Sequence, residues 1–203
     1  MGFYLNESQS ISYIRRNKGY LWLNWNYLKL KIYFNHAERK KNVITIEPLD
    51  DNNIPKLQEL LMRCSDYLVF QDGEPVKVDA AKNLLISKPN NVSINNKKVL
   101  GIYMSRDHSL VGVIDIVMCY AGPDILTLGL LVIEPAMRRN GIGEKAEKLL
   151  ENWARSNNFS QIRLGVLFGN DKGLRFWHKL GYKETGEIKP FLFHKFRVLV
   201  KAI

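Results

Sequence analysis

Apolar and polar positions recur with two different periods along this chain, and the two periods predict its elements. Residues 43–46 alternate as a strand does. A helix is expected next, with Asn52 or Asn53 as its cap and Pro55 in its first turn. Its apolar positions return at helical spacing and give one buried face, formed by Leu57, Leu60, Leu61 and Cys64.

The later apolar runs predict most of a sheet. Residues 125–133 form the longest strand-like run, and an amphipathic helix follows from Gly141 to about Asn157. The polar stretches 71–75 and 88–98 are expected to be loops. The other expected elements are a short helix capped by Asp79, a hairpin of 100–104 with 110–119, a strand at 164–167, a helix from about Asn170, and closing strands near 182–186 and 194–201.

The stretch 128–143, between the longest strand and the amphipathic helix, has the composition of an anion-binding turn. Its apolar run stops at Pro135, two arginines follow, and Gly141 and Gly143 precede the helix. Glycines allow close approach of the backbone, and the positive end of a helix favours an anion. A dinucleotide fingerprint would need a third glycine where Ala146 stands, and the Lys-Ser/Thr of a P-loop does not follow Gly143.

The spacing Arg138-x-x-Gly141-x-Gly143, directly after a strand and a proline, resembles the pyrophosphate loop of the GNAT superfamily of acetyl-CoA-dependent N-acetyltransferases. A second match lies downstream, where a short strand leads to Asn170, an aromatic-bearing helix and a closing Leu-Gly-Tyr at 180–182. Both matches stand in the order and at the spacing that the family shows.

The resemblance covers roughly residues 43–203 and implies an α/β (α+β) fold of GNAT type. Such a fold has a central mixed, mostly antiparallel sheet, flanked by helices, with splayed central strands that hold the pantetheine arm. It further implies acetyl-CoA as co-substrate, an amine as acceptor, and no metal. Carried over by motif, the coenzyme contacts are expected at Leu131, Val132, Ile133, Arg138, Arg139, Asn140, Gly141, Ile142, Gly143 and Asn170. Asn170 can serve as a helix cap, as a coenzyme contact, or as both.

The catalytic groups are less clear from the sequence. Many family members place a tyrosine seven residues after the Asn, and this chain has Trp177 there. An indole N–H donates a hydrogen bond but has no usable acidity, so the thiolate is expected to leave unaided or through water. Tyr182 is expected to be a core residue. Asp115 lies within an apolar strand and either pairs with a basic neighbour or faces the acceptor as a general base.

Four residues after the first helix are candidates for the acceptor pocket, because the family shapes its pocket there: Asp66, Tyr67, Phe70 and Glu74. Acidic side chains at that place would suit a cationic amine, unless they are merely solvated. The function expected is N-acetylation of an amine by direct attack. The missing tyrosine leaves a non-catalytic acyl-CoA-binding sensor or scaffold as the alternative.

Charge is uneven along the 203 residues. The net charge is +10, and residues 1–42, with eight basic and two acidic side chains, carry +6 of it together with nine of the 22 aromatic residues. This extension has no signal-peptide or membrane-span pattern. It is a dispensable leader, a segment that packs on the domain or on a partner subunit, or a membrane- or nucleic-acid-binding segment. Two distant cysteines suit a reducing cytosol. A cytoplasmic monomer or homodimer without a nucleic-acid or membrane partner is therefore expected.

Overall fold

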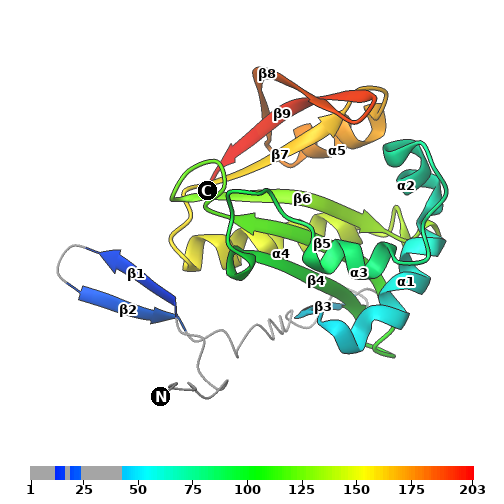
Figure 1. The fold of residues 1–203 in the computed structure, drawn as a ribbon, viewed down its shortest axis with the longest axis horizontal. Coiled ribbons are helices and arrows are strands. Elements are labelled where there is room, and N and C mark those ends of the chain that lie inside the picture. Colours follow the sequence, from blue (N-terminus) through cyan, green and yellow to red (C-terminus); the bar gives the residue numbers. More distant parts are fainter. Residues whose placement is uncertain (1–11, 17–18, 24–42) are drawn as a thin grey trace, which may run out of the picture.

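A seven-stranded sheet forms the body of the protein in the computed structural model, which describes residues 12–16, 19–23 and 43–203 (Figure 1). Its strands are β3 (Ile44–Pro48), β4 (Lys97–Met104), β5 (Leu110–Met118), β6 (Ile125–Ile133), β7 (Gln161–Leu167), β8 (Lys183–Phe191) and β9 (His194–Ala202). They lie in the order β3-β4-β5-β6-β7-β9-β8, and all neighbours are antiparallel except β6 and β7. The mixed, mostly antiparallel sheet predicted from the sequence is confirmed.

Helices cover both faces of this sheet. They are α1 (Ile54–Arg63), α2 (Ser65–Asp72), α3 (Ala80–Ile86), α4 (Ile142–Ser156) and α5 (Asp171–Lys179), with single 3₁₀ turns η3 (Asp51–Asn53), η4 (Ile94–Asn96) and η5 (Pro135–Met137). Apolar side chains of α1, α2 and α3 pack on one face, and those of α4 and α5 pack on the other. The sheet therefore separates two apolar layers, which we call the α1 side and the α4 side.

The start of α1 differs from the prediction in its cap. Asn53 stands at the N-cap position of α1 but makes no side-chain cap bond. Its side chain instead accepts a hydrogen bond from the backbone of Asp50, 2.9 Å away, while Asp50 caps the preceding turn η3. The predicted apolar face of α1 is confirmed, because Leu57, Leu60 and Leu61 are buried.

The region after α1 also differs from the prediction. Residues 71–75 were expected to be a loop, yet a second helix, α2, runs through Asp72 and ends at Gly73. Gly73 takes the left-handed conformation (φ 72°) that glycine adopts without strain. The extra helix carries Tyr67, Phe70 and Gln71 toward strand β9. There, a ring nitrogen of His194 lies 2.9 Å from the backbone oxygen of Phe70.

A β-bulge at Gly129 divides β6 into two halves. Asp115 pairs with Leu130 and Ile116 pairs with Leu128, so Gly129 has no partner on β5. Leu128 belongs to the apolar layer on the α4 side, whereas Leu130 belongs to the layer on the α1 side. One extra residue therefore turns the second half of β6 over relative to the first.

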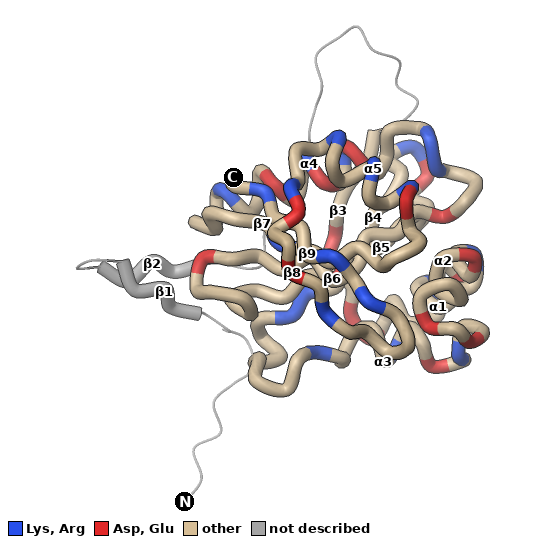
Figure 2. The backbone as a smooth tube through the Cα atoms, turned by 90° about the horizontal axis from the view of Figure 1, so that it is seen from above, with Lys and Arg blue, Asp and Glu red and all other residues tan. Residues whose placement is uncertain are grey.

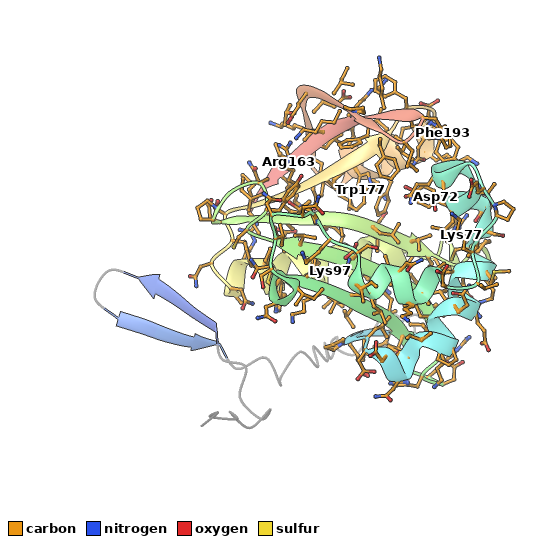
Figure 3. The ribbon with its side chains drawn as sticks, viewed as in Figure 1. Asp72, Lys77, Lys97, Arg163, Trp177 and Phe193 are labelled. Carbon is orange, nitrogen blue, oxygen red and sulfur yellow. The ribbon has the colours of Figure 1, made fainter. Side chains whose placement is uncertain are left out.

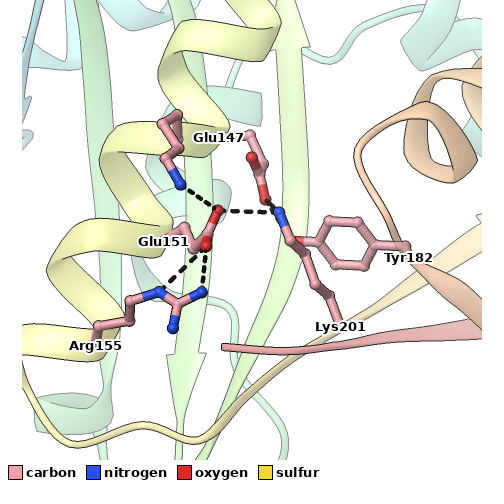
Figure 4. Close-up of polar contacts among 6 residues, drawn as sticks. Glu147, Glu151, Arg155, Tyr182 and Lys201 are labelled. Carbon is pink, nitrogen blue, oxygen red and sulfur yellow. Dashed lines mark hydrogen bonds and ion pairs between the residues drawn. The ribbon is translucent and has the colours of Figure 1, made fainter.

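A buried ionic cluster ties α4 to the last strand (Figure 4). Lys201 Nζ lies 3.0 Å from Glu147 Oε1 and 2.9 Å from Glu151 Oε2, and both glutamates are almost fully buried. Arg155 adds a second cation at 2.7 Å from Glu151, and the Tyr182 hydroxyl donates to Glu147 at 3.1 Å. As expected, Tyr182 is a core residue.

Strands β1 (Ser12–Arg16) and β2 (Gly19–Leu23) pair with each other in a separate two-stranded sheet. The rest of residues 1–42 lies outside the described ranges, so the role of this extension stays a prediction. We expect deletion of residues 1–41 to leave a folded domain that still binds coenzyme, because the seven-stranded sheet begins at Ile44. Circular dichroism and acetyl-CoA calorimetry of the truncated protein check this; an unfolded or insoluble product would show that the extension supplies core or interface.

Candidate functional site

The central strands β6 and β7 separate partway along their length. They pair in parallel only from Ile125 to Leu128 of β6 and from Gln161 to Leu164 of β7. Beyond that point residues 129–133 of β6 have no strand partner on the β7 side among the described residues. Peptide groups on that edge, other than the Ile133 carbonyl that accepts from Arg138, are available to an extended ligand, as they would be to another strand. The predicted splay of the central strands is confirmed, and Leu131, Val132 and Ile133 lie along its free edge.

The helix α4 begins near the open end of this splay, and eight residues separate it from the end of β6. Gly141 occupies its N-cap in the left-handed conformation (φ 72°) and offers no side-chain acceptor to the first turn. Lys145 N–H bonds to Gly141 O at 3.1 Å, so the N–H groups of Ile142 and Gly143 precede the first intrahelical bond. Such an uncapped helix start, at the positive end of the dipole, suits a phosphate group.

Packing beside the helix start is close at Gly143, so a side chain there would require a small shift of its neighbour. A Cβ added to Gly143 would lie 3.3 Å from the ring of Phe176 on α5. Ile142 is buried beneath this turn and fixes it to the α4 side of the core. A ligand can therefore meet the backbone directly at Gly143.

The side chain of Arg138 is already engaged within the protein. Its Nε donates to Ile133 O at 2.7 Å, and its two terminal nitrogens bind both carboxylate oxygens of Asp66 on α2. The hydrogen bond from Arg138 holds the pKa of Asp66 below its ordinary value. Arg139 is exposed in a left-handed conformation, and the Asn140 side chain bonds to the carbonyls of Met137 and Arg138. In this loop the backbone, more than Arg138, is placed for a ligand.

A pocket of about 190 Å³ opens beside the splay on the α1 side. It is lined from α2, the β5–β6 loop and four strands, by Tyr67, Gln71, Tyr120, Thr127, Leu128, Gly129, Arg163, Leu164, Gly165, Leu167, Lys189, Phe191, Phe196 and Val198. Gly129 and Gly165 are the first residues past the end of the β6–β7 ladder, one from each strand. The pocket therefore reaches the point where the two strands separate.

Asp115 makes the basic pairing that the sequence left open. Its Oδ1 lies 2.5 Å from Nζ of the buried Lys97, and Asp115 does not line the pocket. Burial raises the pKa of Asp115, and the charge and hydrogen bond of Lys97 act against that rise. The carboxylate lies against the bulge, because a Cβ on Gly129 would stand 3.2 Å from Asp115 Oδ2.

Asn170 and Trp177 both hold α5 in place. Asn170 caps the helix by accepting a hydrogen bond from Gly173 N at 2.9 Å, which confirms the capping half of its prediction. Trp177 is buried on the α4 side and meets the ring of Tyr182 edge-on, with 5.1 Å between centroids. Burial, with Glu147 close by, raises the pKa of Tyr182 far above its ordinary value, so this phenol keeps its proton at neutral pH.

The four residues expected to shape the acceptor pocket divide into two groups. Tyr67 lines the pocket, and Phe70 packs near it, 6.3 Å from Tyr67 between ring centroids. Asp66 is paired with Arg138, and Glu74 lies exposed beside Lys77 at 3.2 Å. Neither carboxylate lines the pocket.

Several pocket residues were not found from the sequence: Tyr120, Thr127, Arg163, Lys189, Phe191 and Phe196. One signal pointed to Arg163, which interrupts the apolar run of β7 much as Asp115 interrupts that of β5. The others come together only through the order of the strands, which places β9 and β8 after β7 (Figures 2 and 3).

Within the described part of the chain, no helix is long and apolar enough to cross a membrane. No three His, Cys, Asp or Glu side chains of the described residues are grouped so that they could hold a metal ion.

The family model described as the acetyltransferase (GNAT) family matches residues 55–182. No curated protein gives a sequence match. Among solved structures, an acetyltransferase from Thermus thermophilus is 17% identical, with a TM-score of 0.62 over 79% of this chain and 97% of the other. Spermidine N-acetyltransferase from Vibrio cholerae, in complex with CoA and spermine, is 14% identical, with a TM-score of 0.62 over 78% and 95%. The ribosomal-protein-S18-alanine N-acetyltransferase from Escherichia coli is 14% identical, with a TM-score of 0.58 over 79% and 94%.

Proposed function

Because the chain belongs to the GNAT family of acetyltransferases, we propose that it transfers the acetyl group of acetyl-CoA directly to an amine. The observation that carries this proposal is the splay of β6 from β7 with the glycine-capped start of α4 near its open end. A free strand edge suits the amides of a pantetheine arm, and an uncapped helix start suits a pyrophosphate. The two features stand in the order in which those groups occur in the coenzyme.

The proposed contacts follow from this arrangement. Residues 131–133 would pair with the pantetheine arm through their backbone, and the N–H groups from Arg139 to Gly143 would face the pyrophosphate. Arg138 would act by holding the loop against Asp66. Asn170 caps α5, and a coenzyme contact by its remaining amide group is part of the proposal.

The acceptor amine must lose a proton before it attacks. At neutral pH a lysine-like amine, with a reference pKa of ~10.4, is mostly charged. Asp115 is paired with Lys97 behind the bulge, so we propose that it positions the backbone at Gly129 and that the proton leaves through water in the open pocket. Acetyl-CoA supplies the acyl group and a thiolate that leaves without a phenolic acid.

The test is direct. The full chain is incubated with acetyl-CoA and a panel of small amines, amino acids and peptides, and both CoA release and the mass of the acceptor are followed. Acetylation of an amine supports the proposal. Tight binding of acetyl-CoA without transfer to any amine would favour the alternative, a sensor or scaffold. A cytoplasmic location and a monomeric or homodimeric state remain predictions.

The pH dependence of the rate provides a further prediction. We expect the rate to rise from about pH 6 to 9 as the amine loses its proton, without an alkaline fall from a tyrosine near pH ~10. Trp177→Phe should lower the rate less than about tenfold, because the indole packs in the core and is not an acid. An alkaline fall in the wild type that disappears in Tyr182→Phe would contradict this assignment.

A further inference from the structure

The charges that line the pocket are positive. Arg163 and Lys189 line it, and none of the described lining residues is acidic. Glu187 lies outside the lining and bridges the two cations, at 2.5 Å from Arg163 and 3.0 Å from Lys189. Its side chain is 40% exposed. The three groups together carry a net positive charge, which favours a ligand group that is an anion.

The guanidinium of Arg163 has donors to spare. A guanidinium carries five N–H groups in a planar fork. Among the described residues, Arg163 gives one hydrogen bond, from Nη2 to Glu187. The side chain is 20% exposed and lies near the start of β7 (Figure 3). The fork is therefore able to bind two oxygens of one ligand group.

Thr127 provides a second polar group at the same place. Thr127 and Arg163 are register partners across the parallel ladder of β6 and β7. The Thr127 hydroxyl oxygen is buried without a hydrogen-bond partner in the described part of the protein, and Thr127 lines the pocket. A buried hydroxyl without a partner is costly, so this position calls for a ligand atom or a water.

The distance from this pair to the splay is short. The ladder ends one residue later, at Leu128 and Leu164, and Gly129 is two residues from Thr127. Two strand residues span about 6.6 Å. A group held by Thr127 and Arg163 therefore leaves the next few atoms of the same molecule at the opening between the strands.

From these observations we propose that the acceptor is a small amino acid-like molecule, an amine that carries a carboxylate a few atoms away and an apolar body. This inference rests on the proposed acetyl transfer. The carboxylate binds Arg163, Thr127 and Lys189, and the amine faces the splay. The apolar body contacts the aromatic rings of Tyr67, Tyr120, Phe191 and Phe196. The pocket volume of about 190 Å³ fits a molecule of this size.

Matched acceptor pairs test the proposal on the full chain. Alanine, leucine, phenylalanine and tryptophan are each compared with their neutral amides, and phenylalanine also with phenethylamine and with its aminophosphonate analogue. CoA release gives kcat/KM for each compound. We expect the preferred amino acid to exceed its amide by about 30-fold or more, since hydrogen bonds to charged groups are the strong ones.

Variants of Arg163 test whether this residue causes the preference for the amino acid over its amide. Arg163→Met should remove about 30-fold in kcat/KM for the amino acid and leave its amide within about twofold, so the selectivity disappears. Arg163→Lys should retain part of it. Lys183→Met, an exposed lysine on the same strand as Lys189, should change neither value and serves as the control. A misfolded variant would lower both rates alike, so the ratio distinguishes lost recognition from lost structure.

Other outcomes overturn the proposal. If an amide or phenethylamine reacts as well as the amino acid, the protein does not recognise the carboxylate. If the aminophosphonate is preferred, the site binds a phosphate-like group instead. If the Arg163→Met variant keeps the wild-type selectivity, Arg163 does not bind the carboxylate. If no compound is acetylated the inference fails, and acetyl-CoA calorimetry on the same protein then decides whether the proposed function fails with it.

Discussion

Replacement of Gly143 by Glu should weaken acetyl-CoA binding by more than about 100-fold while the protein stays folded. The new side chain would meet the Phe176 ring, 3.3 Å from the position of its Cβ, and would extend over the helix start. Its carboxylate would compete with the pyrophosphate for the same N–H groups and repel it. Two lost charge-assisted hydrogen bonds at about 1.5–3 kcal/mol each account for a loss of this size. A negative charge in the first turn is favourable for the helix itself, so we expect the variant to remain folded.

Isothermal titration with acetyl-CoA, together with circular dichroism, measures both consequences. Gly143→Gln is the matched variant, since glutamine has nearly the same shape as glutamate without the charge. Its affinity for acetyl-CoA should lie between those of the wild type and Gly143→Glu. Wild-type affinity in a folded Gly143→Glu protein would show that the pyrophosphate lies elsewhere.

The second large effect concerns stability. Lys201→Met should lower the free energy of unfolding by about 3–5 kcal/mol, because it leaves a buried Glu147 without the cation that lies 3.0 Å from it. Glu151 suffers less, since Arg155 and Lys148 remain beside it. Urea denaturation measures the loss. Lys148→Met serves as the control: it removes a cation from the same cluster, but that side chain is 61% exposed and its loss should cost less than about 1 kcal/mol.

The same cluster predicts an acid limit to stability. Burial opposes ionisation of Glu151, but hydrogen bonds from Arg155, Lys201 and Lys148 outweigh it and lower its pKa from 4.5 to about 2. A carboxyl group whose pKa is lower in the folded state stabilises the protein at pH values above its unfolded pKa. The contribution of Glu151 is therefore complete above about pH 4.5 and is lost as the pH falls toward 2. Lys201→Met should flatten this part of the stability profile. If Lys201→Met lowers the free energy of unfolding at neutral pH by less than about 1 kcal/mol, the ion pair between Lys201 and Glu147 contributes little to stability.

The sequence predicted the elements well wherever one period was sustained. The bounds expected for β6 agree with the structure, and the helix expected from Gly141 is α4. The helix α2 escaped prediction because Tyr67, Leu68, Val69 and Phe70 are consecutive, so its apolar residues show no helical period. The bulge at Gly129 was not predicted, for a related reason. Regular alternation of leucines along β6 is compatible with one face throughout, and the change of face depends on the register with β5.

The site divides in the same way. The turn and helix start proposed to bind the coenzyme could be predicted because Gly141 and Gly143 act locally and are close in the sequence. The pocket proposed for the acceptor could not be predicted, because Thr127 of β6, Arg163 of β7 and Lys189 of β8 meet only through strand order. The expectation of acidic residues in the pocket rested on the family resemblance, because the family shapes its acceptor pocket just after the first helix. In the structure Asp66 turns toward Arg138 instead of the pocket.

The pair between Asp66 and Arg138 also connects the two sites proposed for the substrates. Asp66 belongs to α2, which contributes Tyr67 and Gln71 to the pocket, while Arg138 belongs to the loop proposed to carry the pyrophosphate. A shift of that loop when the coenzyme arrives would reach α2 through two parallel hydrogen bonds. Coupling of this kind is reciprocal, so each substrate should raise or lower the affinity for the other by the same factor. Such coupling would appear as a Kd for acetyl-CoA that changes when an acceptor is bound, and the change would weaken when Asp66 is replaced by Asn.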